Sequence, residues 1–236
     1  MDGSGYSGPG GSGGGGFSAG LMTLYSANKA YSSWSLRAWL ALSMTGQPFG
    51  QVVIPLGQED SKEMILAHSP SGRLPALRHG GVLTWDSLAI FEYLHESFPD
   101  AQLWPADREA RAHARAICAE MHSGFVNLRR KLPFNIRCEG DDADLDLDTR
   151  LEVNRITDIW RTALKNYGEA EFPFLFGEIC LADAMFAPIA VRFSSYSVPL
   201  DPICQAYCHA LWEWPALQQW KHAALQEEWV DERYEL

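Results

Sequence analysis

The stretch SGRLPALRHGGVLTWDSLAIFEYL, residues 71–94, contains two short apolar runs, a pair of glycines between them and an amphipathic segment after them. The runs 74–77 and 82–85 have the length of β-strands. The two glycines predict a tight hairpin, because glycine adopts the positive φ that such turns require. The amphipathic segment predicts a helix that begins near Asp86 and runs to about residue 98.

Upstream of this hairpin, apolar runs and amphipathic pieces alternate from residue 21 onward. Ser32 and Ser33 introduce the first expected helix, about Trp34 to Met44, whose apolar side chains recur at steps of three and four residues. The other elements expected here are strands at 22–25 and 51–56 and a short helix at about 61–67. The resulting order, β-α-β-α-β-β-α over residues 21–100, predicts an α/β domain.

Long helical periodicities replace the strand-like alternation after Pro99, and residues 106–236 predict an all-helical domain. One apolar stripe runs from Ala114 to Leu132 and another from Ile156 to Tyr167, which predicts two long helices that pair antiparallel. The segment between them, 139–148, is strongly acidic. We expect it to be a solvated loop.

The rest of the second domain and the beginning of the chain complete this outline. Residues 182–193 are apolar nearly all round, which predicts a helix buried at the centre of the domain. Two more helices are expected at about 202–213 and 215–227. Residues 1–20 hold ten of the twenty glycines and are expected to form a flexible tail or linker.

Composition and charge favour a soluble protein with small ligands. The net charge is −11, and no basic cluster exceeds Arg129-Arg130-Lys131, which argues against nucleic acid and anionic membrane surfaces as partners. The longest apolar stretch, 179–193, is too short to cross a bilayer. The five cysteines form no CxxC motif, so a reducing, cytoplasmic location is expected. His113 and His122 lack ligand partners at metal spacing, so no metal is expected.

Three local features suggest chemistry. Ser32 precedes the first helix, where outward-pointing N–H groups and the helix dipole stabilise an anion. A cis Leu74–Pro75 bond would turn the Leu74 backbone N–H and C=O outward, free to pair with an extended peptide ligand. Asp86 and Ser87 open the third helix, where a carboxylate and a hydroxyl could hold both charged ends of an amino-acid group. Each feature alone also has a purely structural explanation as a cap or a turn.

Taken together, their order and spacing resemble those of the cytosolic glutathione transferases. Further similarities are residues 71–77, which resemble the glutathione-site loop of that family, 86–94, which resemble its acidic-Ser-x-Ala-Ile pattern, and 174–184, which resemble the capping segment of its helical domain. The resemblance implies a thioredoxin-like N-terminal domain followed by an all-α domain. It also implies a homodimer.

Within the family, Ser32-Ser33-Trp34-Ser35-Leu36-Arg37 most resembles the Ser-Ser-Cys-x-x-Arg signature of the zeta class and related bacterial serine-type enzymes. Trp34 stands where zeta proteins carry cysteine, which argues against the zeta-type isomerisation of maleylacetoacetate. Cys180 occupies the position where the helical domain usually has a capping serine or threonine, so Asp183 must hold that cap with less help.

The resemblance implies a glutathione site with one catalytic residue. Ser32 would donate a hydrogen bond to the sulfur, with Ser33, Tyr25 and Tyr31 as rival donors. The residues implied in glutathione binding are Ser33, Lys62, Arg73, Leu74, Pro75, Asp86 and Ser87.

Each group of the tripeptide would have its own contact. The Leu74 backbone would pair with the cysteinyl part, and Asp86 with Ser87 would hold the γ-glutamyl end. A cation would meet the glycine carboxylate, with Arg73 as the first candidate and Lys62 as the weaker one.

Glutathione reacts as its thiolate, and a free thiol has a pKa of about 8.5. Lowering that pKa by about two units requires roughly 2.7 kcal/mol, which one hydroxyl hydrogen bond and a helix N-terminus can supply. The expected activity is addition of this thiolate to a small hydrophobic electrophile. Two alternatives stay open: glutathione-dependent cis-trans isomerisation, and a non-catalytic binding scaffold with the same fold.

Overall fold

The computed structural model describes residues 20–140, 144–232 and 234. The predicted tail, residues 1–20, lies outside the described residues except for Gly20. Within the described residues, no helix combines the length and the apolar character needed to cross a membrane.

The N-terminal part is built on a four-stranded sheet of order β2-β1-β3-β4. β1 pairs in parallel with β2 and antiparallel with β3, and β3 and β4 form the antiparallel hairpin predicted from the glycine pair. The strands are β1 (Met22–Ser26), β2 (Phe49–Val53), β3 (Ala76–His79) and β4 (Val82–Trp85).

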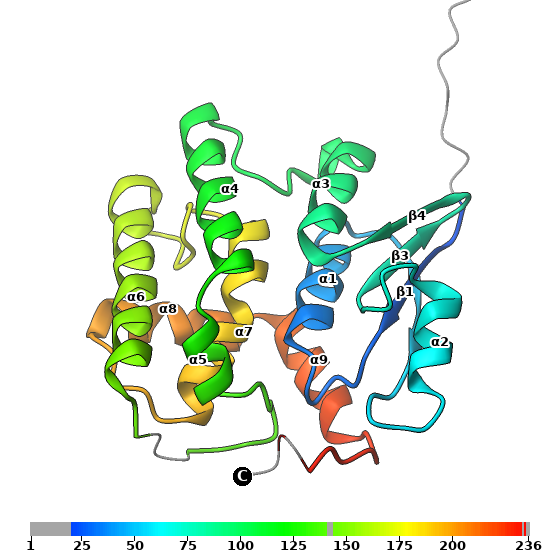
Figure 1. Cartoon of the computed structure of the whole chain (residues 1–236). Helices are drawn as coiled ribbons and strands as arrows, with labels where there is room; N and C mark the ends of the chain where they lie inside the picture. Colours follow the sequence, from blue (N-terminus) through cyan, green and yellow to red (C-terminus); the bar gives the residue numbers. More distant parts are fainter. Residues whose placement is uncertain (1–19, 141–143, 233, 235–236) are drawn as a thin grey trace, which may run out of the picture.

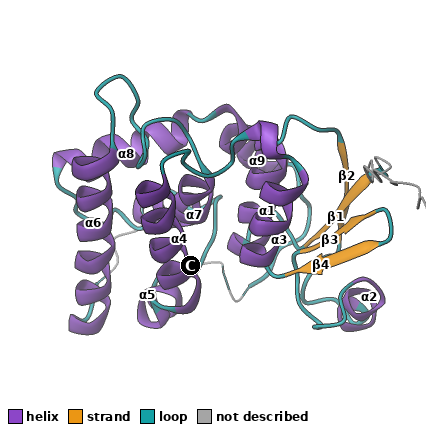
Figure 2. Ribbon diagram, turned by 90° about the horizontal axis from the view of Figure 1, so that it is seen from above, coloured by secondary structure: helices purple, strands orange, loops and turns teal. Residues whose placement is uncertain are grey.

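Three helices cover this sheet. They are α1 (Ser33–Met44), α2 (Ser61–His68) and α3 (Ser87–Ser97). Helices α1 and α3 lie on the face that is turned toward the rest of the molecule, and α2 lies on the other face (Figure 1, Figure 2). A small apolar cluster joins α2 to the sheet, whereas α1 and α3 belong to the main core. The predicted β-α-β-α-β-β-α order is confirmed.

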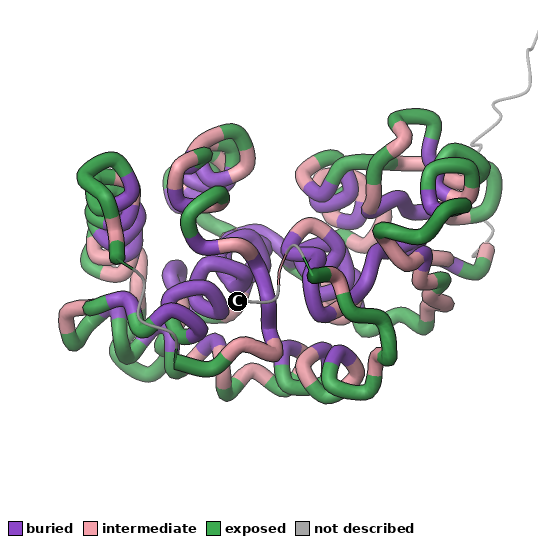
Figure 3. Tube along the Cα trace, turned by 60° about the horizontal axis from the view of Figure 1, so that its bottom comes forward, coloured by how far each residue is buried: buried purple, intermediate pink, exposed green. Residues whose placement is uncertain are grey.

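The rest of the chain is helical, as predicted. After a 3₁₀ turn at Pro99–Ala101, the helices are α4 (Arg108–Ser123), α5 (Val126–Lys131), α6 (Leu147–Tyr167), α7 (Leu181–Ser195), α8 (Pro202–Glu213) and α9 (Pro215–Leu225). Helix α7 is buried along almost its whole length and packs against α1, α4 and α8. Figure 3 shows the buried positions gathered between the helices and the exposed positions on their outer turns. One continuous core therefore joins both parts of the chain.

One long helix is predicted where the structure has two. Helix α4 ends at Ser123 with Gly124 as its C-cap, and Phe125 adopts the left-handed conformation with φ 60° before α5 begins. Glu152 of α6 supplies the missing cap, because its carboxylate accepts the N–H groups of Asn127 and Leu128 at 3.3 and 2.7 Å. The apolar stripe continues across the break, since Phe125 and Leu128 are both buried. The break therefore leaves no trace in the apolar spacing.

Helices α4 and α6 run antiparallel, as predicted (Figure 1). Arg155 of α6 forms a bidentate ion pair with Glu120 of α4, with a shortest distance of 2.6 Å. The last two residues of the acidic segment 139–148 are the first two residues of α6. Asp146 caps this helix, because its side chain accepts the Thr149 N–H. The described residues before this cap, 139–140 and 144–145, lie outside helices and strands.

Candidate active site between the sheet and the helical domain

A cleft of about 760 Å³ lies between the loop that precedes β3, the start of α3 and the end of α4. Arg73, Leu74, Pro75, Asp86 and Ser87 line it, so the fold brings together five of the eight predicted site residues. The other lining residues are Trp34, Ser71, Trp85, His122 and Ser123.

The loop before β3 forms one wall of the cleft. The Leu74–Pro75 peptide bond is cis. Among the described residues, the Leu74 N–H has no hydrogen-bond acceptor. Because the strand pairing of β3 begins only at Ala76, this N–H is open to main-chain pairing with a peptide-like ligand.

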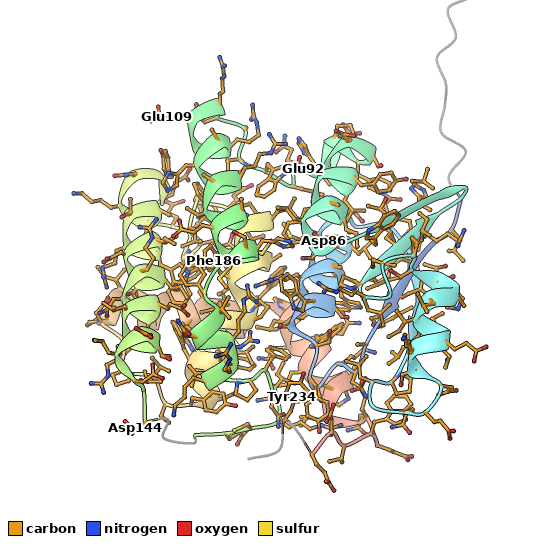
Figure 4. All side chains as sticks on the ribbon, in the orientation of Figure 1. Asp86, Glu92, Glu109, Asp144, Phe186 and Tyr234 are labelled. Atoms are coloured by element: carbon orange, nitrogen blue, oxygen red, sulfur yellow. The ribbon has the colours of Figure 1, made fainter. Side chains whose placement is uncertain are left out.

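The opposite wall is the start of α3, where Figure 4 places Asp86. Asp86 caps the helix through Oδ1, which accepts the Leu88 N–H at 2.9 Å, and it holds an unusual φ of 75°. Side chains other than glycine adopt positive φ at a cost, and such residues cluster at functional sites. Next to it, Ser87 is fully buried and its hydroxyl has no partner among the described residues. A carboxylate and an unpartnered hydroxyl thus lie side by side in the cleft.

His122 links this wall to the helical domain. Its Nε2 lies 3.2 Å from Asp86 Oδ2, so α4 contacts the start of α3 across the cleft. Burial lowers the pKa of His122, while the neighbouring Asp86 carboxylate raises it and Arg37 and Arg129 lower it further. Burial dominates, so His122 is mainly neutral at neutral pH and its contact to Asp86 joins a neutral imidazole to a carboxylate.

Ser32 caps α1 and is buried, but it is not among the residues that line the cleft. Its Oγ accepts the Ser35 N–H at 3.2 Å and donates to Ser35 Oγ at 2.9 Å. Ser35 Oγ in turn accepts the Ala27 N–H at 3.0 Å. The Ser32 proton must therefore rotate away from Ser35 before it can meet a sulfur atom.

The rival donors have other contacts. Ser33 is buried, and its Oγ accepts from Arg192 at 3.4 Å. Tyr25 stacks on His68 beneath α2 with ring centroids 4.1 Å apart, and Tyr31 stacks on Tyr234 at 5.6 Å. None of these three lines the cleft.

The two candidate cations are placed differently. Arg73 lines the cleft, whereas Lys62 is exposed on α2 and is not among the lining residues. The geometry thus favours Arg73 as the cation for a carboxylate bound in the cleft.

Trp34 lines the cleft and contacts two guanidinium groups. The guanidinium carbons of Arg37 and Arg129 lie 4.7 and 4.8 Å from its ring centroid, and the His122 ring meets it edge-on at 5.1 Å. Burial lowers the pKa of Arg37, and the nearby guanidiniums of Arg129 and Arg192 lower it further. These contacts fix the Trp34 ring in place.

Sequence reasoning overlooked the role of Ser35. Ser32 is at the N-cap and Ser35 is three residues later, where its N–H faces the cap side chain, so this spacing could have identified Ser35 as the partner of the Ser32 hydroxyl. The sequence contains no comparable signal for the contact between His122 and Asp86, because these two residues belong to different domains. In the described part of the chain, no group of three or more His, Cys, Asp or Glu side chains is arranged to hold a metal ion.

Comparisons with known proteins agree with this fold. The sequence profile of the glutathione S-transferase N-terminal domain matches residues 27–102. Maleylacetoacetate isomerase of Rattus norvegicus is 36% identical over 191 residues, which cover 78% of this chain and 83% of that protein. A probable maleylacetoacetate isomerase of Caenorhabditis elegans is 36% identical over 105 residues, so the chain matches only about half, 48%, of its length.

A solved structure extends the comparison to the fold. A glutathione transferase homologue from Burkholderia gl BGR1, with bound glutathione, has a TM-score of 0.66 and 26% identity, covering 88% of this chain and all of that one. The chain therefore belongs to the glutathione S-transferase family. Within this family, it is similar to proteins named maleylacetoacetate isomerase.

Proposed function

We propose that this protein binds glutathione in the cleft and uses its thiolate to isomerise the cis double bond of an unsaturated keto acid, of the maleylacetoacetate or maleylpyruvate type. The observation that carries the proposal is the gathering of Arg73, Leu74, Asp86 and Ser87 in one cleft, in a chain that resembles isomerases over most of its length. The motifs alone point first to conjugation of a hydrophobic electrophile. The relatives favour isomerisation instead.

The site residues have separate roles in this proposal. The Leu74 N–H pairs with the cysteinyl carbonyl of glutathione, Asp86 accepts the γ-glutamyl ammonium, and Ser87 donates to the γ-glutamyl carboxylate. Arg73 meets the glycine carboxylate, since Lys62 is not among the cleft residues. The Leu74 N–H and the Ser87 hydroxyl thereby gain the partners that they lack among the described residues.

Ser32 and the start of α1 act on the sulfur. The Ser32 hydroxyl turns from Ser35 to the thiolate, and the partial positive charge of the helix N-terminus supports the same anion. The Ser35 N–H still donates to Ser32 Oγ during this rotation, so the cap of α1 is kept. The effect is a lower pKa of the bound thiol and therefore a larger fraction of thiolate at neutral pH.

The reaction consumes no glutathione. The thiolate attacks one carbon of the conjugated cis double bond, a C–S bond forms, and the π electrons move onto the keto oxygen as an enolate. The former double bond is now single and rotates. The enolate then returns its electrons, the C–S bond breaks, and the trans product leaves with the thiolate regenerated.

Conjugation is the second candidate, and Trp34 favours it. An indole stands where the zeta class carries cysteine, and it gives the cleft lining an apolar surface suited to an aromatic electrophile. In this reaction the C–S bond forms and a leaving group such as halide departs, so glutathione is consumed.

A paired assay separates these readings. The protein is incubated with glutathione and a cis-configured maleyl keto acid, or with an aryl halide, while product and remaining thiol are both measured. We expect trans product with no loss of thiol, and at most slow conjugation of the aryl halide. Thiol loss equal to product, seen only with the halide, would instead establish conjugation. No retention on immobilised glutathione and no heat on titration would point to a binding scaffold.

Asp86→Asn is expected to raise the KM for glutathione about tenfold, with a smaller effect on kcat, because a charge-assisted hydrogen bond to the ammonium is lost. Asparagine still caps helices well, so α3 keeps its start. The measurement is steady-state kinetics at several salt concentrations. Glu96→Gln, elsewhere on α3, serves as the control. A KM that does not change in Asp86→Asn would remove this carboxylate from the glutathione site.

A further inference from the structure

The loop that leads into α1 is held by residues from the far end of the chain. Glu227, two residues beyond α9, accepts the N–H of Lys29 through Oε1 at 2.8 Å and the N–H of Ala30 through Oε2 at 3.1 Å. These partners are 198 and 197 residues apart in sequence. A single carboxylate thus binds two consecutive backbone N–H groups just before Ser32.

The carbonyl groups of the same two residues are bound as well. Trp220 Nε1 donates to the Lys29 carbonyl at 3.0 Å, and the Ile136 N–H donates to the Ala30 carbonyl at 3.0 Å. All four backbone polar groups of Lys29 and Ala30 are therefore bonded to the helical domain. Because no backbone group is left to water or to the loop itself, the path of this segment depends on those contacts.

This segment sets the position of Ser32. The Ser32 N–H donates to the Asn28 carbonyl at 3.0 Å, which closes a turn around Lys29 and Ala30. The Ser32 side chain begins α1 directly after this turn. A shift of the two clamped residues would therefore be passed on to the hydroxyl and to the first N–H groups of the helix.

The Glu227 segment is itself anchored. Arg137 donates to the Ala224 carbonyl at 2.7 Å, to the Trp229 carbonyl at 3.2 Å and to the Glu227 carbonyl. Tyr234, labelled in Figure 4, stacks on the Tyr31 ring. The carboxylate of Glu227 is thus presented from a fixed backbone, on the same side of the molecule as the start of α1.

We propose that Glu227 is a positioning residue for the reaction: its carboxylate clamps the Lys29 and Ala30 N–H groups and so holds Ser32 and the N-terminus of α1 at the sulfur of glutathione. This inference rests on the proposed function of Ser32. A hydrogen bond to a carboxylate is stronger than one to a neutral group, and small misplacements of a catalytic group reduce rates steeply. Glu227 touches neither substrate nor sulfur, so its effect runs through Ser32.

The test compares Glu227→Gln and Glu227→Ala with Glu228→Gln. Glu228 is the exposed neighbour in the same segment, so its variant removes the same charge without touching the loop. The readouts are kcat, the KM for glutathione and the pKa of the bound thiol. Ultraviolet thiol-difference spectra recorded across pH measure this pKa. Thermal unfolding of each variant shows whether it remains folded.

We expect Glu227→Ala to lower kcat about tenfold or more and to raise the pKa of the bound thiol, with the KM within about twofold. The kcat and the thiol pKa of Glu227→Gln should lie between those of Glu227→Ala and the wild type, because the glutamine amide oxygen can still accept one N–H. Glu228→Gln should match the wild type. If the alanine variant does not fold, the comparison of Glu227→Gln with Glu228→Gln and the wild type still tests the positioning role.

Two outcomes overturn the inference in different ways. If the wild type lowers the thiol pKa but both folded Glu227 variants do so equally, Glu227 has no positioning role and the proposed function stands. If bound glutathione titrates as it does in solution even in the wild type, the proposed function fails and the positioning role fails with it.

Discussion

Ser32→Ala is expected to lower kcat at least about tenfold at neutral pH while the KM for glutathione changes little. The reason is that a thiol with a pKa of about 8.5 is only a few per cent ionised at neutral pH. Loss of the stabilising hydroxyl therefore lowers the fraction of bound glutathione that is present as the reactive thiolate. In the proposed site, glutathione is held instead by Leu74, Asp86 and Ser87, which this change leaves in place. Steady-state kinetics and thiol-difference spectra measure both effects.

The buried pair of hydroxyls makes a second variant informative. Ser35→Ala removes the atom to which Ser32 donates, but it keeps the Ser35 N–H that Ser32 Oγ accepts. Its turnover should therefore stay well above that of Ser32→Ala. If Ser32→Ala keeps wild-type turnover, the sulfur donor must be reassigned to Ser33, Tyr25 or Tyr31, which the same measurements on Ser33→Ala and the two Tyr→Phe variants would decide.

Asp183→Ala is expected to lower the free energy of unfolding by at least about 3 kcal/mol, because it leaves three buried donors without an acceptor. Asp183 is fully buried at the start of α7 and accepts the Cys180 N–H at 2.8 Å, the Leu175 N–H at 3.2 Å and the Tyr207 hydroxyl at 3.0 Å. Urea unfolding measures the change. Asp146→Ala is the control, since Asp146 caps α6 at an exposed position and should cost about 1 kcal/mol. Equal losses in the two variants would contradict this account.

The same carboxylate gives stability a defined pH dependence. Burial raises the pKa of Asp183 from 3.8 to about 6, although its three donors lower it. The folded state therefore holds a proton that the unfolded state has released, and the contribution of this group to stability is lost as pH rises from about 4 to about 6. Asp183→Asn cannot titrate. The stability difference between Asp183→Asn and wild type should thus change across this window and level off above it, which urea unfolding at several pH values can follow.

The predictable part of the site is local in sequence. Arg73, Leu74, Asp86 and Ser87 all belong to the single stretch 71–94, where a strand, a hairpin and a helix start follow one another. Turn chemistry and capping act over a few residues, so these positions and the order of their elements can be read from the chain. The start of α1 is equally local, and the predicted and observed helices differ there by one residue.

Other features depend on contacts between distant segments. The helical run breaks at Phe125, between α4 and α5, and Glu152 of α6 caps the start of α5, while the apolar spacing continues unchanged across the break. The hydrogen bond from Lys29 to Glu227 and the contact between His122 and Asp86 also join residues that are far apart in the sequence.

Residue type and spacing were enough to predict the α/β and helical halves, the family and the loop before β3 that lines the candidate cleft, because helix, strand and turn formation are governed by interactions between near neighbours in the chain. Packing alone determined which serine hydroxyl is engaged with Ser35, which cation reaches the cleft, and which remote carboxylate holds the start of α1. Those arrangements depend on distances between atoms from separate elements, and no pattern along the chain encodes such distances until the core has brought the elements together.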